Sequence, residues 1–150
     1  MTQEAKPART ITHTVRVEFG DCDPAAIVWF PNFFRWIDAA SRHFFAECGV
    51  PRWEDTTKTI GVIGTPLVDT HTKFLKTASY GDLLLIRTQI TEWRDKSFVQ
   101  TYRVVRIRPD GEEDVILECN EVRIFASKRE DGKNGIRAVP IPRSIRALCE

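Results

Sequence analysis

The sequence lacks several features that would assign it at once to a familiar class. Its four cysteines are widely spaced over 150 residues, with no C-x-x-C pair among them. No apolar segment at the N-terminus resembles a signal peptide, and no apolar run approaches the roughly 20 residues that a membrane-spanning helix needs. These absences predict a reduced, cytoplasmic protein.

Charge is nearly balanced and a phosphate-binding loop is missing. The sequence has 22 basic and 21 acidic residues, a formal net charge of +1, so it shows neither a nucleic-acid footprint nor an acidic tail. It has no Gly-rich motif to cradle a phosphate. We therefore expect a small-molecule partner, with no nucleic acid, no membrane and no cofactor, and any anion must be held by local basic side chains.

The length fits one domain, which would bury roughly 68–70% of the surface that its unfolded chain exposes. Residues 1–9 form a polar leader by composition, and we assign residues 10–150 to a single domain. Apolar residues alternate with polar ones from Ile11 to Phe19, which predicts a strand with one buried face that ends at Gly20. From Pro31 to Cys48 apolar residues recur every three or four positions, which predicts an amphipathic helix.

Beyond this helix, which Gly49 and Pro51 should end, the helical period is lost until the last residues. Turn-forming clusters separate five predicted strands, at residues 67–75, 83–93, 97–107, 115–126 and, shorter, 136–141. A short helix is predicted at the C-terminus. The fold class is therefore α+β, with one long helix followed by a meander of antiparallel strands long enough to curl around it.

The stretch "EFGDCDPAAIVWFPNFFRWIDAASR", residues 18–42, carries the candidate chemistry. Its two aspartates could be ordinary turn residues that accept hydrogen bonds from backbone amides. A metal site is less favoured, because hard cations want several oxygen ligands and the next carboxylate after Asp23 is Asp38. Cys22 as a nucleophile would need a nearby base, and the candidates are His13, His43 and His71.

A third interpretation gives Asp23 the central role. A carboxylate with an ordinary pKa near 3.9 is ionised at pH 7, so it can attack a thioester carbonyl or deprotonate a water molecule. The oxyanion that develops needs hydrogen-bond donors, and free amides at the start of the following helix can supply them. Residues 27–30 lie where such donors are needed.

The same stretch closely resembles the signature of the 4-hydroxybenzoyl-CoA thioesterase family. The similarity continues through "GTPLVDTHTKFLKTASYGD", "EWRDKSFVQ" and "EVRIFA" to "IRAVPIP", so it covers nearly all of the chain after residue 10. The resemblance implies a hot-dog fold, in which a curved antiparallel sheet of about five strands wraps the long helix. It also implies hydrolysis of an aromatic acyl-CoA, most favourably 4-hydroxybenzoyl-CoA.

The resemblance implies roles for individual residues too. Asp23 matches the catalytic carboxylate, and the backbone N–H of Phe30 matches the group that polarises the thioester carbonyl. Close family members carry Tyr and Gly where this chain has Phe30 and Ala26, which leaves the choice of aromatic acid open. Substrate-binding positions are matched by Trp53, Thr65, Pro66, Leu67 and Asp38 around the acyl and pantetheine groups, and by Arg94, Lys96 and Arg137 at the nucleotide.

Several of these residues also have ordinary structural interpretations. Trp53, expected on the loop after the helix, could pack beneath that loop, and Arg94 and Lys96 could belong to a solvated charged turn. Two alternative functions stay open, a short-chain acyl-CoA thioesterase of the same fold and a non-catalytic acyl-CoA-binding protein. A single hot-dog sheet exposes its edges, so we expect a homotetramer, a dimer of dimers, whose active sites lie at subunit interfaces as the family implies.

Overall fold

The computed structural model describes residues 8–150, so most of the predicted leader, residues 1–9, lies outside the described part. The elements in chain order are β1 (Ile11–Arg16), the 3₁₀ turn η1 (Phe19–Asp21), α1 (Pro31–Glu47), α2 (Trp53–Ile60), β2 (Leu67–Phe74), β3 (Leu83–Trp93), β4 (Ser97–Ile107), β5 (Glu113–Ile124), β6 (Ala126–Lys128), β7 (Ile136–Ala138) and α3 (Arg143–Cys149). No helix among the described residues is long and apolar enough to cross a membrane.

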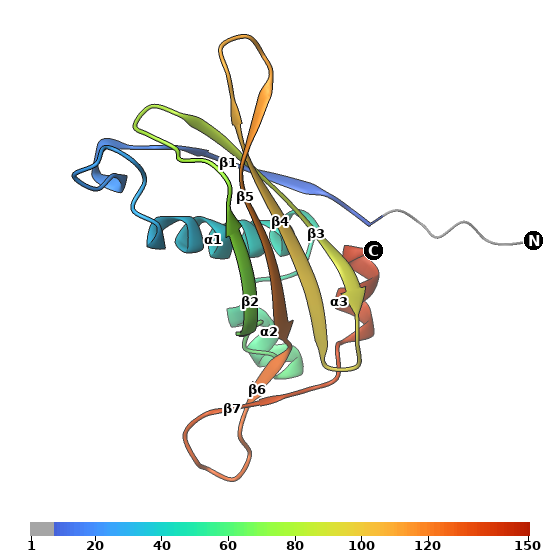
Figure 1. Cartoon of the computed structure of the whole chain (residues 1–150). Coiled ribbons are helices and arrows are strands. Elements are labelled where there is room, and N and C mark those ends of the chain that lie inside the picture. The colour runs from blue at the N-terminus through green and yellow to red at the C-terminus, as the bar shows by residue number, and fades with distance from the viewer. Residues whose placement is uncertain (1–7) are drawn as a thin grey trace, which may run out of the picture.

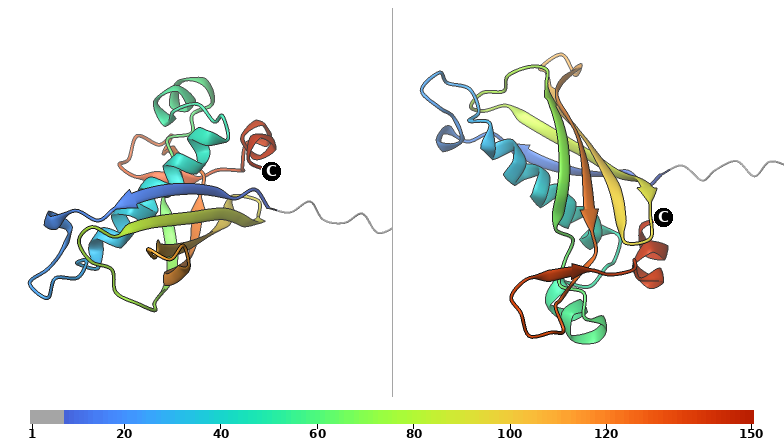
Figure 2. Two further views of the ribbon diagram at one scale, coloured as in Figure 1. Left: turned by 90° about the horizontal axis from the view of Figure 1, so that it is seen from above. Right: turned by 60° about the horizontal axis from the view of Figure 1, so that its bottom comes forward.

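Five strands form one antiparallel sheet in the order β1-β3-β4-β5-β2, and β6 and β7 form a separate small hairpin. The central strands β3, β4 and β5 have 11, 11 and 12 residues, and they curve around one side of α1 (Figure 1; Figure 2). This is the hot-dog arrangement, so the predicted fold class is confirmed. The two strands at the edges of the sheet are β1 and β2.

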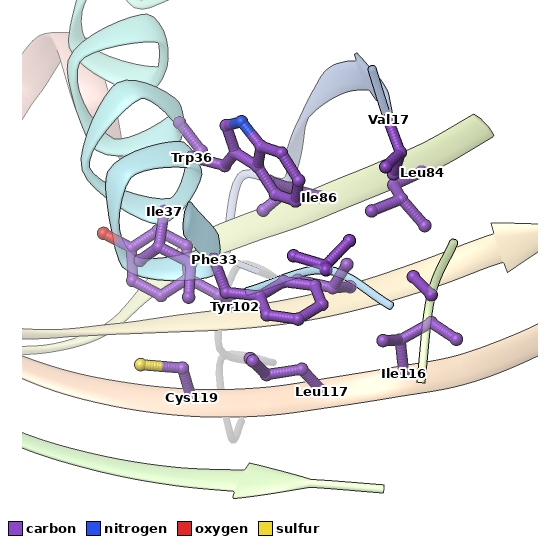
Figure 3. Packing of buried hydrophobic residues seen from close by; sticks show 14 residues of the cluster. Val17, Phe33, Trp36, Ile37, Leu84, Ile86, Tyr102, Ile116, Leu117 and Cys119 are labelled. Atoms are coloured by element: carbon purple, nitrogen blue, oxygen red, sulfur yellow. The ribbon is translucent and has the colours of Figure 1, made fainter. Parts of the chain in front are cut away.

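The helix α1 packs into the concave face of the sheet because its apolar side chains lie on one stripe. Pro31 occupies the first turn, where a missing N–H costs nothing. Phe33, Ile37, Ala40 and Phe44 are then buried at helical spacing. Figure 3 shows Phe33, Trp36 and Ile37 of α1 facing strand residues such as Tyr102 and Leu117.

Three expectations about the secondary structure were wrong in detail. The first strand ends at Arg16, and Phe19 enters η1 with 80% of its surface exposed instead of facing the core. The strand predicted at 115–126 divides into β5 and β6. Trp53 begins a helix, α2, where a loop was expected, because this short polar helix buries only Thr56 and therefore shows no apolar period.

Candidate functional site

The segment between β1 and α1 is held in place by backbone hydrogen bonds. Val28 N–H donates to the Ala78 carbonyl at 2.8 Å, and Trp29 N–H donates to the Asp21 carbonyl at 3.0 Å. Within the segment, Asp23 N–H donates to the Ile27 carbonyl at 2.9 Å. The chain thus forms a fixed loop, with Asp23 on it, immediately ahead of the helix.

The two aspartates of this loop have different surroundings. Asp21 is structural: its Oδ2 accepts from Glu18 N–H at 2.8 Å, and its Oδ1 lies 3.3 Å from the guanidinium of Arg35. Asp23 accepts one hydrogen bond, from Ala25 N–H to Oδ1 at 2.8 Å. Among the described residues, Asp23 Oδ2 has no donor, so this oxygen is free to attack an electrophile or to accept a proton.

The backbone at the start of α1 offers a donor of the predicted kind. Phe30 is the N-cap residue of α1, and its carbonyl accepts from Phe33 N–H at 3.1 Å. Within residues 8–150 its own N–H has no acceptor. A free amide at a helix N-terminus can stabilise negative charge on a carbonyl oxygen, both by a hydrogen bond and through the helix dipole.

An apolar pocket of about 270 Å³ adjoins this amide. Its walls include Ile27, Phe30 and Phe33 at the start of α1, with Phe74 and Ala78 at and beyond the end of β2. Three aromatic rings of the helix start, those of Phe30, Phe33 and Phe34, lie edge-on to Phe74 at centroid distances of 6.0–6.5 Å. The pocket therefore has flat, apolar walls of the kind that an aromatic ring can contact.

The cysteine interpretation gains no support from the geometry. The thiol of Cys22 donates to the carbonyl of Glu18 at 3.8 Å. His13 and His43 pack against each other, with ring centroids 5.1 Å apart. The pKa of His13 is lowered, mainly by burial and to a smaller extent by the proximity of His43. His71 lies on the outer face of the sheet among polar side chains.

Asp38 and Thr65 are brought together by a residue that sequence reasoning missed. Arg123 on β5 donates to the Thr65 carbonyl at 2.9 Å and lies 3.3 Å from Asp38 Oδ1. Its side chain is only 7% exposed and is paired with the equally buried Glu121. The alternation of side chains along the strand could have predicted that Glu121 and Arg123 point inward, since they share a strand face with the core residue Cys119.

The other residues predicted near the acyl group lie at the same end of the sheet as Thr65. Pro66 accepts from Ile124 N–H at 3.1 Å, and Leu67 begins β2 with 45% of its surface exposed. Trp53 packs edge-on against Phe45 at 5.4 Å and Phe125 at 6.4 Å. Within one chain, Trp53 is thus a packing residue, as its structural interpretation predicted.

The three basic residues predicted to bind the nucleotide lie far from Asp23 within one chain. Arg94 and Lys96 are exposed on the turn between β3 and β4, and Arg137 is on β7. Figures 1 and 2 show this turn and the loop ahead of α1 on opposite sides of the molecule. Arg94 is paired with Glu92 at 3.1 Å and Arg137 with Glu130 at 2.8 Å, whereas Lys96 has no ion-pair partner among the described residues.

The hot-dog fold and the loop that carries Asp23 are those of a thioesterase-like protein. Comparison with known families agrees. The model of the thioesterase-like superfamily matches residues 17–148, and the chain belongs to this family. Among the described residues, no group of three or more His, Cys, Asp or Glu side chains could hold a metal ion.

Individual relatives are similar along their whole length. A 4-hydroxybenzoyl-CoA thioesterase of Pseudomonas sp. (strain CBS-3) is 49% identical over 142 residues, which cover 95% of this chain and 99% of the relative. The crystal structure of a 4-hydroxybenzoyl-CoA thioesterase, with an aspartate replaced by asparagine and 4-hydroxybenzoyl-CoA bound, superimposes with a TM-score of 0.91 at 46% identity and covers 95% of this chain and 100% of its own. A gentisyl-coenzyme A thioesterase has a TM-score of 0.74 at 32% identity, covering 91% of this chain and 99% of its own.

Proposed function

We propose that the chain hydrolyses an aromatic acyl-CoA thioester, with 4-hydroxybenzoyl-CoA as the favoured substrate, to the free aromatic acid and coenzyme A. One observation carries the proposal: Asp23 presents an unengaged carboxylate oxygen on the loop that also forms an aromatic-walled pocket and ends in the free Phe30 amide. The full-length similarity to thioesterases of aromatic acyl-CoA substrates supports the same substrate class.

In the proposed reaction Asp23 Oδ2 attacks the thioester carbonyl while the Phe30 amide stabilises the oxyanion. The carbon–sulfur bond breaks and coenzyme A leaves as a thiolate, so an aroyl anhydride of Asp23 forms. Water cleaves the anhydride, which restores the Asp23 carboxylate and releases the aromatic carboxylate and two protons, one of which the thiolate takes up. In the alternative role, Asp23 deprotonates a water molecule that attacks the thioester directly.

The remaining predicted residues take binding roles in this proposal. Asp38, Thr65, Pro66, Leu67 and Trp53 line the path of the acyl and pantetheine groups. Arg94, Lys96 and Arg137 bind the phosphates of coenzyme A by charge-assisted hydrogen bonds. Because these basic residues and Asp23 lie on opposite sides of one chain, we place the complete site between subunits.

A homotetramer built from dimers is part of the proposal. The edge strand β2 has seven exposed residues and one half-buried residue, although it includes the apolar residues Leu67, Val68 and Phe74. An unpaired edge that exposes apolar side chains is normally covered, and a second copy of the chain can cover it. We also propose a reducing, cytoplasmic location, which the four free cysteines favour.

A panel of CoA thioesters, assayed by release of free thiol, tests the function. We expect turnover of 4-hydroxybenzoyl-CoA above benzoyl-CoA and well above acetyl-CoA or butyryl-CoA. Faster turnover of the short-chain esters would instead establish the alternative enzyme, and binding without any thiol release would establish an acyl-CoA-binding protein.

Hydroxylamine tests the role of Asp23 within that function. An anhydride at Asp23 should be intercepted to give the aromatic hydroxamate during turnover, in proportion to the concentration of active enzyme. Turnover without hydroxamate above the level of an enzyme-free control would favour Asp23 as a general base.

A further inference from the structure

The guanidinium of Arg123 joins three elements of the fold. It makes a bidentate pair with Glu121 on its own strand, from Nε to Oε1 at 3.0 Å and from a terminal nitrogen to Oε2 at 3.2 Å. The same terminal nitrogen lies 3.3 Å from Asp38 Oδ1 on α1. The other terminal nitrogen donates to the carbonyl of Thr65, just ahead of β2, at 2.9 Å.

The charges in this cluster leave Asp38 available to a ligand. Glu121 is 3% exposed and Arg123 is 7% exposed, so they form a buried pair that is neutral as a unit. Burial alone would lower the pKa of the Arg123 guanidinium, but the hydrogen bonds and charge of Glu121 raise it on balance. Asp38 is half-exposed, and its second oxygen faces Arg42 at a looser 3.6 Å. One carboxylate oxygen is therefore fixed and the other remains accessible.

We infer that Arg123 is a positioning residue for substrate selection, acting through Asp38 and Thr65. The inference rests on the proposed function, in which these two residues contact the acyl group. A carboxylate fixed at one oxygen can accept a hydrogen bond from a hydroxyl group on the aromatic ring, and a charge-assisted bond of this kind discriminates against a ring without the hydroxyl. The planar fork of arginine holds both contacts at once, which the single ammonium group of lysine cannot do.

The experiment compares kcat/KM for 4-hydroxybenzoyl-CoA with kcat/KM for benzoyl-CoA. Arg123→Lys keeps the charge and removes the fork, and we expect the ratio to fall roughly tenfold, mainly through the hydroxylated substrate. Asp38→Asn should lower the same ratio. If Arg123 acts through Asp38, adding Arg123→Lys to Asp38→Asn should lower it no further.

The chain offers a matched control in Arg87 on β3. The two terminal nitrogens of this arginine make a bidentate pair with the carboxylate of Glu113 on β5. Arg87→Lys therefore makes the same chemical change in a bidentate pair of the same sheet that does not contact Asp38, and it should leave the substrate ratio unchanged. A fall in the ratio for both variants would show a general effect of loosening the sheet and would overturn the inference.

A second variant covers the case in which Arg123→Lys does not fold. Replacing Glu121 and Arg123 together by glutamine removes both buried charges at once and avoids an unpaired one. Its substrate ratio should fall as well, and failure of both variants to fold would assign Arg123 a purely structural role. An unchanged ratio in a folded Arg123→Lys protein would overturn the inference alone, whereas a wild-type protein that hydrolyses neither substrate would overturn the proposed function.

Discussion

The carboxylate of Asp23 is oriented by the backbone amide of Ala25, which donates to Oδ1 at 2.8 Å and leaves Oδ2 without a donor among the described residues. This contact resembles an ordinary turn, in which an aspartate caps an amide two residues later. Here the turn does more than stabilise the loop, because it fixes one oxygen and thereby aims the other. The turn and catalytic interpretations of the sequence are therefore compatible.

Replacing Asp23 by asparagine should keep the loop and remove the chemistry. The amide oxygen of asparagine can still accept from Ala25, but a neutral carboxamide is a poor nucleophile and a poor base. We expect kcat to fall on the order of 10³-fold or more, with substrate binding and thermal stability nearly unchanged. Thiol release, isothermal titration and thermal denaturation would measure the three quantities.

Cys22→Ser is the matched control for this variant, because Cys22 precedes Asp23 and bonds only weakly to Glu18. We expect its kcat to stay within about twofold of wild type. Wild-type turnover by Asp23→Asn would contradict the mechanism, and an inactive Cys22→Ser protein would favour the thiol as the nucleophile.

Ala26 is the one non-glycine residue with a positive φ among those described, at 64°. This left-handed conformation costs an alanine about 1–2 kcal/mol, whereas glycine adopts it freely. Glycine also gives the unfolded chain more freedom, which offsets about 0.4–1 kcal/mol. We therefore predict that Ala26→Gly raises the free energy of unfolding by up to about 1.6 kcal/mol, as urea denaturation would measure.

Ala25→Gly is the control, since Ala25 has no positive φ to relieve. It should lower stability by about 0.4–1 kcal/mol through the unfolded state alone. Equal losses in the two variants would mean that the conformation of Ala26 stores no strain.

The periodic parts of the fold were predictable from the sequence. The bounds predicted for β3 and β4 agree with the structure, because turn-forming clusters flank both strands in the sequence. The helix α2 was missed because contacts outside it stabilise it. Thr56 on its buried side donates to the carbonyl of Val62 at 2.7 Å. A periodic pattern of apolar residues cannot predict such a contact.

The candidate site was predictable only where neighbours in sequence are neighbours in space. Asp23 and the Phe30 amide belong to one loop, so a local motif could place them together. Arg123 meets Asp38 across 85 positions and Thr65 across 58, and such contacts depend on how the sheet wraps the helix.

Asp114 should make stability depend on pH in the acid range. Lys76 and Arg106 each donate to its carboxylate at 2.9 Å, and these hydrogen bonds lower the pKa of Asp114 from 3.8 to about 2. Since the folded-state pKa is depressed, the stabilising contribution is fully present above about pH 4 and is lost as the pH falls through about 2. The stability difference between wild type and Asp114→Asn should therefore be constant from pH 5 to 7 and shrink below pH 4.

Urea denaturation across this range would measure that difference, with Asp110→Asn as the control. Asp110 is an exposed turn residue whose one ion-pair partner among the described residues is Arg108, at 3.3 Å. Its replacement should have little effect at any pH. A stability difference for Asp114→Asn that persists undiminished at pH 2 would contradict the assignment.

Arg94 and Lys96 are proposed to bind phosphates of coenzyme A at the rim of the site. Exposed charge contacts contribute about 0.2–1 kcal/mol each, so the Arg94→Ala, Lys96→Ala double variant should raise KM a few-fold and leave kcat nearly unchanged. The matched control is Glu92→Gln, which releases Arg94 from its present partner and should lower KM slightly. The decisive comparison uses the same aroyl thioester on a truncated pantetheine, which has no nucleotide phosphates and should be insensitive to all three changes. Equal losses on the two substrates would show that Arg94 and Lys96 form only a charged turn.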